Sequence, residues 1–168
     1  MATSLEVQVG ISVRGQYTNT TDLGSSVQKV GYAPVCNFSN GTGAEQANKY
    51  FEDTRTLTAS STEDLDLYGG LTDVFGNTLN ITKIKFIIIR AAATNTNDVV
   101  VGGAAGSPIV SLFGTATDKI NLKPGTGICL FATDSTAYAV VTSTADLLKV
   151  ANGGGTTSVS YDIIIGGV

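Results

Sequence analysis

Apolar and polar residues alternate at the start of the chain. Five apolar residues occupy alternate positions: Leu5, Val7, Val9, Ile11 and Val13. A period of two residues is typical of a strand with one buried face. The pattern predicts a strand over residues 5–13, a polar, loop-like stretch over residues 14–26, and a second strand over residues 27–35 that stops near Pro34.

A short helix is predicted next. Thr42 and Glu45 have the spacing of a capping box, in which the N-cap hydroxyl and the acidic side chain satisfy each other's backbone N–H groups. Ala44, Ala47 and Phe51 then fall on one face of a helix. We expect this helix to end at residues 53–54.

From residue 54 onward, short apolar runs are separated by turn residues such as Gly, Asn, Asp and Pro. Many short strands at this spacing favour an all-β domain of the β-sandwich or jelly-roll type. We therefore divide the chain into an N-terminal arm with strands and one short helix (residues 1–53) and a sandwich domain (residues 54–168). The strands expected in the sandwich cover residues 62–68, 79–93, 99–101, 109–113, 119–122, 127–133, 137–142, 146–151 and 158–165.

Within the longest of these runs, alternation gives way to the continuous apolar sequence of residues 86–89. Such a change is expected where one end of a strand is buried on both faces.

The alternating strand at the start of the chain suggests a contact with another subunit. An apolar strand near a chain terminus suits pairing with the sheet edge of a neighbouring subunit. We therefore expect inter-subunit contacts at five residues: Leu5, Val7, Val9, Ile11 and Val13.

The composition indicates a polar but weakly charged surface. Apolar residues make up 42% of the chain and charged residues only 14%, well below the usual quarter. Charged side chains are depleted at the centres of protein interfaces, so much of this surface would meet another protein. A sandwich with threonine-rich outer faces explains the same composition, and the sequence leaves both explanations open.

Several classes of function are disfavoured by composition. A net charge of −4 and a pI near 4.6 argue against a nucleic-acid partner, since only Lys83, Lys85 and Arg90 come close together. The absence of histidine excludes histidine-based catalysis and histidine-ligated metals. Cys36 and Cys129 are too few for a structural zinc site, and nothing in the sequence supports a disulfide between them. We expect no cofactor, no metal and no enzymatic activity.

The start of the sequence lacks the basic and apolar regions of a signal peptide, and no apolar run has the length of a membrane span. The sequence therefore predicts a protein made in the cytoplasm that stays soluble and has no membrane partner.

An acidic cluster is the main candidate for chemistry. It consists of Glu63, Asp64, Asp66 and Asp73. Asp64 and Asp66 would share a strand face, as the ligands of a Ca²⁺ site or the carboxylate pair of a hydrolase would. However, the spacing of a Ca²⁺-binding loop is absent. A charged, solvated strand face that discourages wrong edge pairing is the favoured interpretation. The glycine-rich stretch at residues 41–43 likewise matches no nucleotide-binding motif.

Several stretches together resemble a family of small bacteriophage and prophage virion proteins. The resemblance covers about the last three-quarters of the chain, and residues 1–40 match less clearly. Its segments are residues 41–67, 71–76 (LTDVFG), 84–85, 101–105 (VGGAA), 123–125 (KPG), 147–152 (LLKVAN) and 161–166 (YDIIIG).

This resemblance implies a structural component of a phage particle, and we expect a capsid decoration or cement protein. It would act as a homo-oligomer, expected to be a trimer, bound to the major capsid protein or to other virion proteins. Its location would be the virion. A tail, neck or head-fibre protein is the alternative. A glycan-binding sandwich is a further one, although the six dispersed tyrosines and the absence of tryptophan do not favour an aromatic platform.

Overall fold

The computed structural model describes residues 4–168, which form strands and one short helix. In chain order the elements are β1 (Val7–Gly10), β2 (Val13–Thr21), β3 (Gly24–Tyr32), β4 (Val35–Asn40), β5 (Gln46–Ala47), β6 (Lys49–Leu57), β7 (Thr62–Asp66), β8 (Tyr68–Thr72), β9 (Thr78–Asn80), β10 (Lys83–Ala91), β11 (Val99–Gly102), α1 (Val110–Phe113), β12 (Lys119–Leu122), β13 (Gly127–Phe131), β14 (Tyr138–Ala139), β15 (Leu147–Asn152) and β16 (Val159–Gly167).

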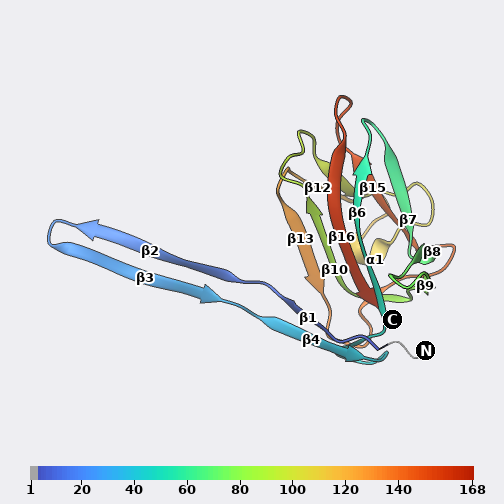
Figure 1. Ribbon diagram of the computed structural model, residues 1–168, viewed down its shortest axis with the longest axis horizontal. Coiled ribbons are helices and arrows are strands. Elements are labelled where there is room, and N and C mark those ends of the chain that lie inside the picture. The colour runs from blue at the N-terminus through green and yellow to red at the C-terminus, as the bar shows by residue number, and fades with distance from the viewer. Residues whose placement is uncertain (1–3) are drawn as a thin grey trace.

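Two sheets packed face to face form a sandwich (Figure 1). The first sheet has the strand order β13-β10-β16-β6, and β14 also pairs with β10. The second sheet has the order β12-β11-β15-β7. Neighbouring strands within both sheets are antiparallel. The structure thus confirms the all-β, sandwich-like class that the sequence predicts.

The main core lies between these sheets and is built by alternate residues of each strand. On β15, for example, Leu148 and Val150 are buried while their neighbours are less so. They meet inward-facing side chains of the first sheet, such as Ile87 and Ile163. Burial of branched aliphatic side chains on both inner faces supplies the main driving force for this packing.

The first sheet is buried on its outer face as well, at one end. Phe86, which points away from the main core, packs with Val9, Phe38 and Ala47 in a second cluster. Ile87 and Ile89, on the opposite face of β10, belong to the main core. This double burial confirms what the continuous apolar run at residues 86–89 predicts, because each face of β10 is covered by a different part of the chain.

The N-terminal part forms a long antiparallel arm that leaves the sandwich (Figure 1). Its inner portion pairs β1 with β4, and its outer portion pairs β2 with β3 over nine residues of each strand. The two portions are separated by irregular residues at the same level on both sides, residues 11–12 and 33–34. Pro34 lies in this break, consistent with its inability to donate a backbone hydrogen bond to a ladder.

The helix predicted after Thr42 is wrong. Glu45 instead adopts a φ of 51° in a turn, and the Gly43 N–H donates to the side chain of Gln46 rather than to a capping box. The following residues form β6, which pairs with β16 along its whole length. Residues such as Tyr50, Phe51 and Thr54 favour strands, and long-range pairing with β16 outweighs the local helical signal.

The short helix occurs where a strand was predicted, at residues 109–113. Ile109 is buried in the main core, and Leu112 and Phe113 pack against that core from the helix. Gly114, with a φ of 90°, ends the helix after a single turn. α1 has only four residues, and within residues 4–168 none of the helices has the length and hydrophobicity of a membrane span.

Two further strand predictions need correction. The stretch at residues 14–26, expected to be loop, contains nearly all of β2 and the start of β3. The single strand expected over residues 79–93 is two strands, because the chain turns at residues 81–82 between β9 and β10. The boundary proposed between residues 53 and 54 falls inside β6, an edge strand of the sandwich.

The division of the chain into an arm and a sandwich domain stays a prediction.

Candidate interaction surface

The outer hairpin, β2 and β3, is exposed along its full length. Every residue of both strands is solvent-exposed. A two-stranded hairpin alone in water is marginally stable at best, and each of its strands presents an unpaired backbone edge. A segment with these properties is suited to contact with another surface.

The two faces of the hairpin differ in chemistry. Residues that face each other across antiparallel strands share one face of the ribbon. The register pairs Val13 with Tyr32 and Gly15 with Val30, and it pairs Tyr17 with Gln28. One face therefore carries Val13, Tyr17, Val30 and Tyr32, and we call it the apolar face.

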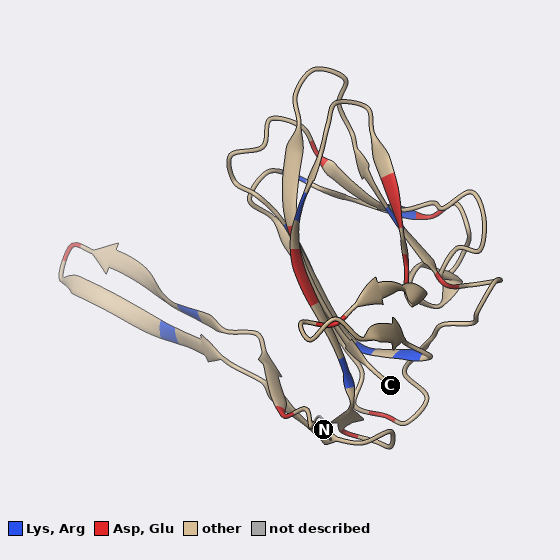
Figure 2. Cartoon of the chain, turned by 45° about the vertical axis from the view of Figure 1, so that its right-hand side comes forward, with Lys and Arg blue, Asp and Glu red and all other residues tan. Residues whose placement is uncertain are grey.

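The opposite face is basic. The register pairs Gln16 with Lys29 and Arg14 with Gly31 on this side. We call the side that carries Arg14, Gln16 and Lys29 the basic face. β2 and β3 contain no acidic residue, and Asp22 lies in the turn between them. Figure 2 shows the two basic residues on the hairpin, whereas most acidic residues lie on the sandwich.

Exposed apolar side chains are concentrated on this arm. Within residues 4–168, eight of the twelve large apolar side chains that are exposed fall between residues 11 and 35. Leu23, at the tip, is fully exposed, and Tyr17 is 75% exposed. Apolar surface gathered in one place marks an interaction site more often than scattered residues do. The hairpin is therefore the best candidate for a functional surface.

The five residues predicted to contact another subunit are divided between two environments. Val9 is 4% exposed and belongs to the second cluster, against which Leu5 and Val7 also pack. Ile11 and Val13 are exposed. The first three side chains thus fasten the arm to its own sandwich, while the last two lie at the start of the projecting part.

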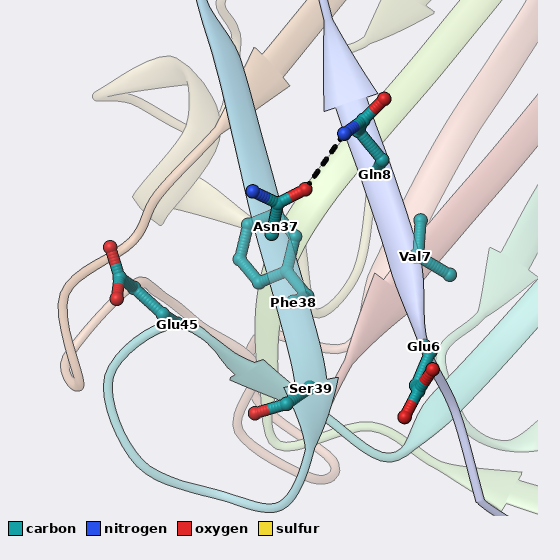
Figure 3. A pocket seen from close by; sticks show the side chains of 7 residues that line it. All are labelled: Glu6, Val7, Gln8, Asn37, Phe38, Ser39 and Glu45. Atoms are coloured by element: carbon teal, nitrogen blue, oxygen red, sulfur yellow. Dashed lines mark hydrogen bonds between the residues drawn. The ribbon is translucent and has the colours of Figure 1, made fainter.

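A shallow hollow of about 490 Å³ lies along the fixed part of the arm. It is lined by Glu6, Val7, Gln8, Asn37, Phe38, Ser39 and Glu45 (Figure 3). The Gln8 side-chain amide donates to Asn37 across the two strands at 2.9 Å, and Phe38 is buried in the second cluster. These contacts hold β1 to β4 and β4 to the sandwich, so we assign the hollow a structural role.

A buried lysine ties the arm to the sandwich at the same place. Lys85 is fully buried, and its ammonium group donates to the carbonyl of Gly43, at 2.9 Å, and to the carbonyl of Asp134. Burial lowers the pKa of Lys85. Lys85 is one of the three basic residues that come close together in the sequence. Its ammonium group is thus used in internal hydrogen bonds.

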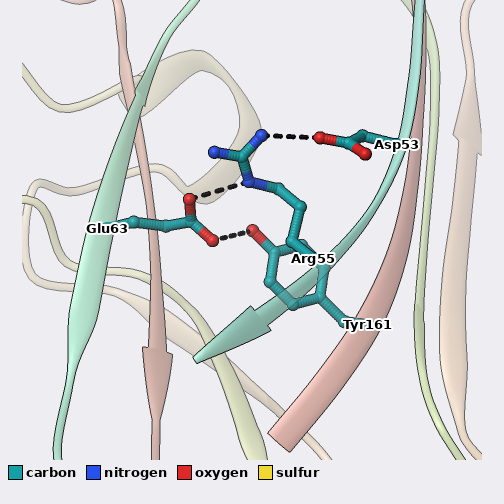
Figure 4. A network of polar contacts seen from close by, with 4 residues as sticks. All are labelled: Asp53, Arg55, Glu63 and Tyr161. Atoms are coloured by element: carbon teal, nitrogen blue, oxygen red, sulfur yellow. Dashed lines mark hydrogen bonds and ion pairs between the residues drawn. The ribbon is translucent and has the colours of Figure 1, made fainter. Parts of the chain in front are cut away.

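A polar network closes one side of the sandwich (Figure 4). The Tyr161 hydroxyl donates to Glu63 at 2.6 Å, and the Arg55 guanidinium bridges Glu63 and Asp53 at 2.8 Å each. Glu63 comes from β7 and the other three residues from β6 and β16, so the network joins the two sheets. Burial and the hydrogen bond to Glu63 raise the pKa of Tyr161 well above its usual range.

Removing the tyrosine hydroxyl tests this network. We expect Tyr161→Phe to lower the free energy of unfolding by about 1–3 kcal/mol, because a hydrogen bond to a carboxylate is lost and one carboxylate oxygen is left without its donor. Urea unfolding measures the effect, with Tyr32→Phe on the exposed hairpin as the matched control. Equal stability of the two variants would show that the network contributes nothing.

The acidic cluster proposed from the sequence does not assemble into one site. Glu63 joins Arg55 and Tyr161, and Asp66 accepts a hydrogen bond from the backbone N–H of Tyr68. Asp64 is exposed on β7, and Asp73 caps a turn by accepting from Asn77. Among the residues that the structure describes, no group of three or more His, Cys, Asp or Glu side chains has the arrangement of a metal site.

Comparison with known proteins adds no relative. No protein-family model, no curated protein and no solved structure matches this chain.

The two cysteines are both free and half-buried. Cys36 on β4 and Cys129 on β13 pack against the second cluster, which links the fixed part of the arm to the first sheet. Burial raises the pKa of the Cys129 thiol. In this arrangement both thiols act as small apolar side chains.

Sequence reasoning missed the principal surface residues of the hairpin, Tyr17, Leu23, Val30 and Tyr32. Two signals were present in the sequence. Tyr17 lies in phase with the alternation of Leu5 to Val13 but beyond the end of the predicted strand, and Asp22-Leu23-Gly24 offers turn residues between two stretches. The abundance of Thr, Asn and Ser between them favoured a loop, because those residues are typical of turns.

Proposed function

We propose that this chain is a structural protein of a bacteriophage particle, and that it decorates the capsid as a homo-oligomer, expected to be a trimer. The projecting hairpin is the observation that carries the proposal. An extended nine-residue strand reaches about 30 Å at roughly 3.3 Å per residue, far enough to lie on a neighbouring subunit. The choice of a phage particle rests on the resemblance of residues 41–67 and the later segments to phage virion proteins.

The combination of a sandwich, a fixed inner part of the arm and a projecting hairpin supports a linking role. The sandwich is a compact body, and β1 with β4 fixes the arm to it through Val9 and Phe38. The hairpin beyond is left to contact a partner. When many copies sit on a repeating shell, modest contacts are multiplied by avidity, so such an arm stabilises the shell without a large interface per copy.

Copy number in purified particles tests this proposal. We expect quantitative gel densitometry, calibrated on the major capsid protein, to give copies on the order of hundreds per particle. A handful of copies would instead support a tail, neck or head-fibre protein and would overturn the decoration role. Absence from purified particles would overturn both.

Removal of the hairpin tests the role of the arm. Residues 11–34 are replaced by Asn-Gly, a dipeptide that closes two-residue hairpin turns, joining Gly10 to Val35, which already face each other across β1 and β4. We expect this variant to fold but to bind particles that lack the protein about a hundredfold more weakly or worse, measured by co-sedimentation. Val141→Ser, an exposed apolar change outside the arm, is the control, and unchanged binding of the shortened chain would contradict the linking role.

A further inference from the structure

One edge of the sandwich is open over a long stretch. β6 is the last strand of the first sheet and pairs only with β16 among the described residues. Its middle residues, Glu52, Asp53 and Thr54, are exposed. A long unpaired edge is a template for an added strand from another chain.

The other sandwich edges are shorter. β6 has nine residues, as do both strands of the hairpin. The strands at the remaining ends of the two sheets, β7, β12 and β13, have five, four and five residues. Among the edges of the sandwich, only β6 is therefore long enough to form a complete ladder with a nine-residue strand.

The charges of the hairpin and of this edge are complementary. Neither Arg14 nor Lys29 takes part in an ion pair within residues 4–168. On the outer face of the first sheet, Glu52 and Asp162 lie on adjacent strands and line a shallow hollow of about 440 Å³. Glu52 binds the Tyr50 hydroxyl through one oxygen at 2.7 Å, and its other oxygen is available to a cation.

Antiparallel pairing of β3 with β6 over their full length matches both faces. It sets Lys29 opposite Glu52 and Val30 opposite Phe51. The basic face then continues the acidic outer face of the first sheet. The apolar face continues the inner face, on which Phe51 and Leu57 are buried. Residues facing each other on adjacent strands interact directly, so opposite charges at this position stabilise the register.

We propose that the arm of one copy adds β3 to the free edge of β6 in a second copy of this chain. The inference rests on the linking role given to the arm in the proposed function and names the surface that receives it. The arm points away from its own sandwich (Figures 1 and 2), so the strand is given to a neighbour. An arm-to-edge contact joins two different surfaces, and repetition around a rotation axis closes it into a ring.

Charge reversal on the full-length chain tests the contact. Lys29→Glu sets two carboxylates opposite each other, and Glu52→Lys sets two ammonium groups opposite each other. Each change is expected to weaken self-association at least about tenfold in analytical ultracentrifugation, since like charges in register repel. The double variant, K29E with E52K, restores the pair in reverse and should associate as the unmodified chain does. Lys119→Glu, the same charge change on the exposed start of β12, is the control.

Cross-linking tests the register. In a background with Cys36→Ala and Cys129→Ala, Val27→Cys and Thr54→Cys face each other in the proposed pairing, and oxidation should give covalent oligomers on a non-reducing gel. Val27→Cys with Thr56→Cys is offset by two residues and should cross-link poorly.

An unmodified chain that stays monomeric at all concentrations, or an oligomer indifferent to K29E and E52K, would overturn the inference. These outcomes are separate from the test of the proposed function. A monomer in solution that is present in hundreds of copies per particle leaves the decoration role standing without this contact. If β3 pairs with β6 of a second copy but the protein is absent from particles, the contact stands and the decoration role falls.

Discussion

Phe86→Ala is expected to lower the free energy of unfolding by about 3–5 kcal/mol, the usual range when a buried phenylalanine is truncated. Phe86 is 1% exposed. Its ring packs against Phe38 with the centroids 5.3 Å apart, and it also covers Gly166 on the adjacent strand. The variant therefore loses apolar burial and leaves a cavity between the arm and the first sheet.

Urea unfolding followed by circular dichroism measures this loss. The control is Phe75→Ala, which removes the same atoms from a side chain that is 75% exposed and should change stability by less than about 0.5 kcal/mol. Limited proteolysis adds a local measurement, because a weakened second cluster should expose the fixed part of the arm to cleavage. Equal stability of the two variants would contradict the role given to Phe86.

Gly166→Ala is expected to lower the free energy of unfolding by about 1–3 kcal/mol, the range for overpacking in a filled core. A Cβ atom at Gly166 would lie 2.0 Å from the Phe86 ring, much closer than any ordinary contact. The ring or the strand must move to admit the methyl group. Gly106→Ala, a position with open space around it, is the control and should be nearly neutral.

A double-mutant cycle shows whether the glycine is needed because of the ring. In the Phe86→Ala background the space beside residue 166 is open, so Gly166→Ala should cost little or nothing. The two effects should be non-additive by about 1 kcal/mol or more, the behaviour of residues in direct contact. Additive losses would show that Gly166 is required for another reason.

Strands with one buried face could be predicted from the sequence alone. β7, β12 and β15 lie close to the predicted ranges, because alternate residues enter a core and their periodicity is a local property. Burial of β10 on both faces was also visible in its continuous apolar run. For the candidate surface, the pattern at Leu5 to Val13 located the arm but not the part of it that projects.

The errors arose where distant contacts decide the structure. The capping-box pattern at Thr42 and Glu45 is local, whereas β6 is an edge strand of the sandwich because it pairs with β16, more than a hundred residues later. The apolar sequence of residues 109–113 resembles a strand. In the structure Ile109 is buried in the main core, and α1 begins at the next residue. The exposed hairpin has no buried face, so its polar composition gave only a weak strand signal.

By itself, the sequence determined the all-β class, the strands whose alternation matches a buried face, and the charge and composition of the surface. Only the tertiary structure decided that Val9 fastens the arm to its own sandwich, that Tyr17, Val30 and Tyr32 share one face of a projecting hairpin, and that β6 offers an open edge of equal length. The physical reason is that periodicity depends on near neighbours, whereas the register of a hairpin and the free edge of a sheet depend on which distant strands pair.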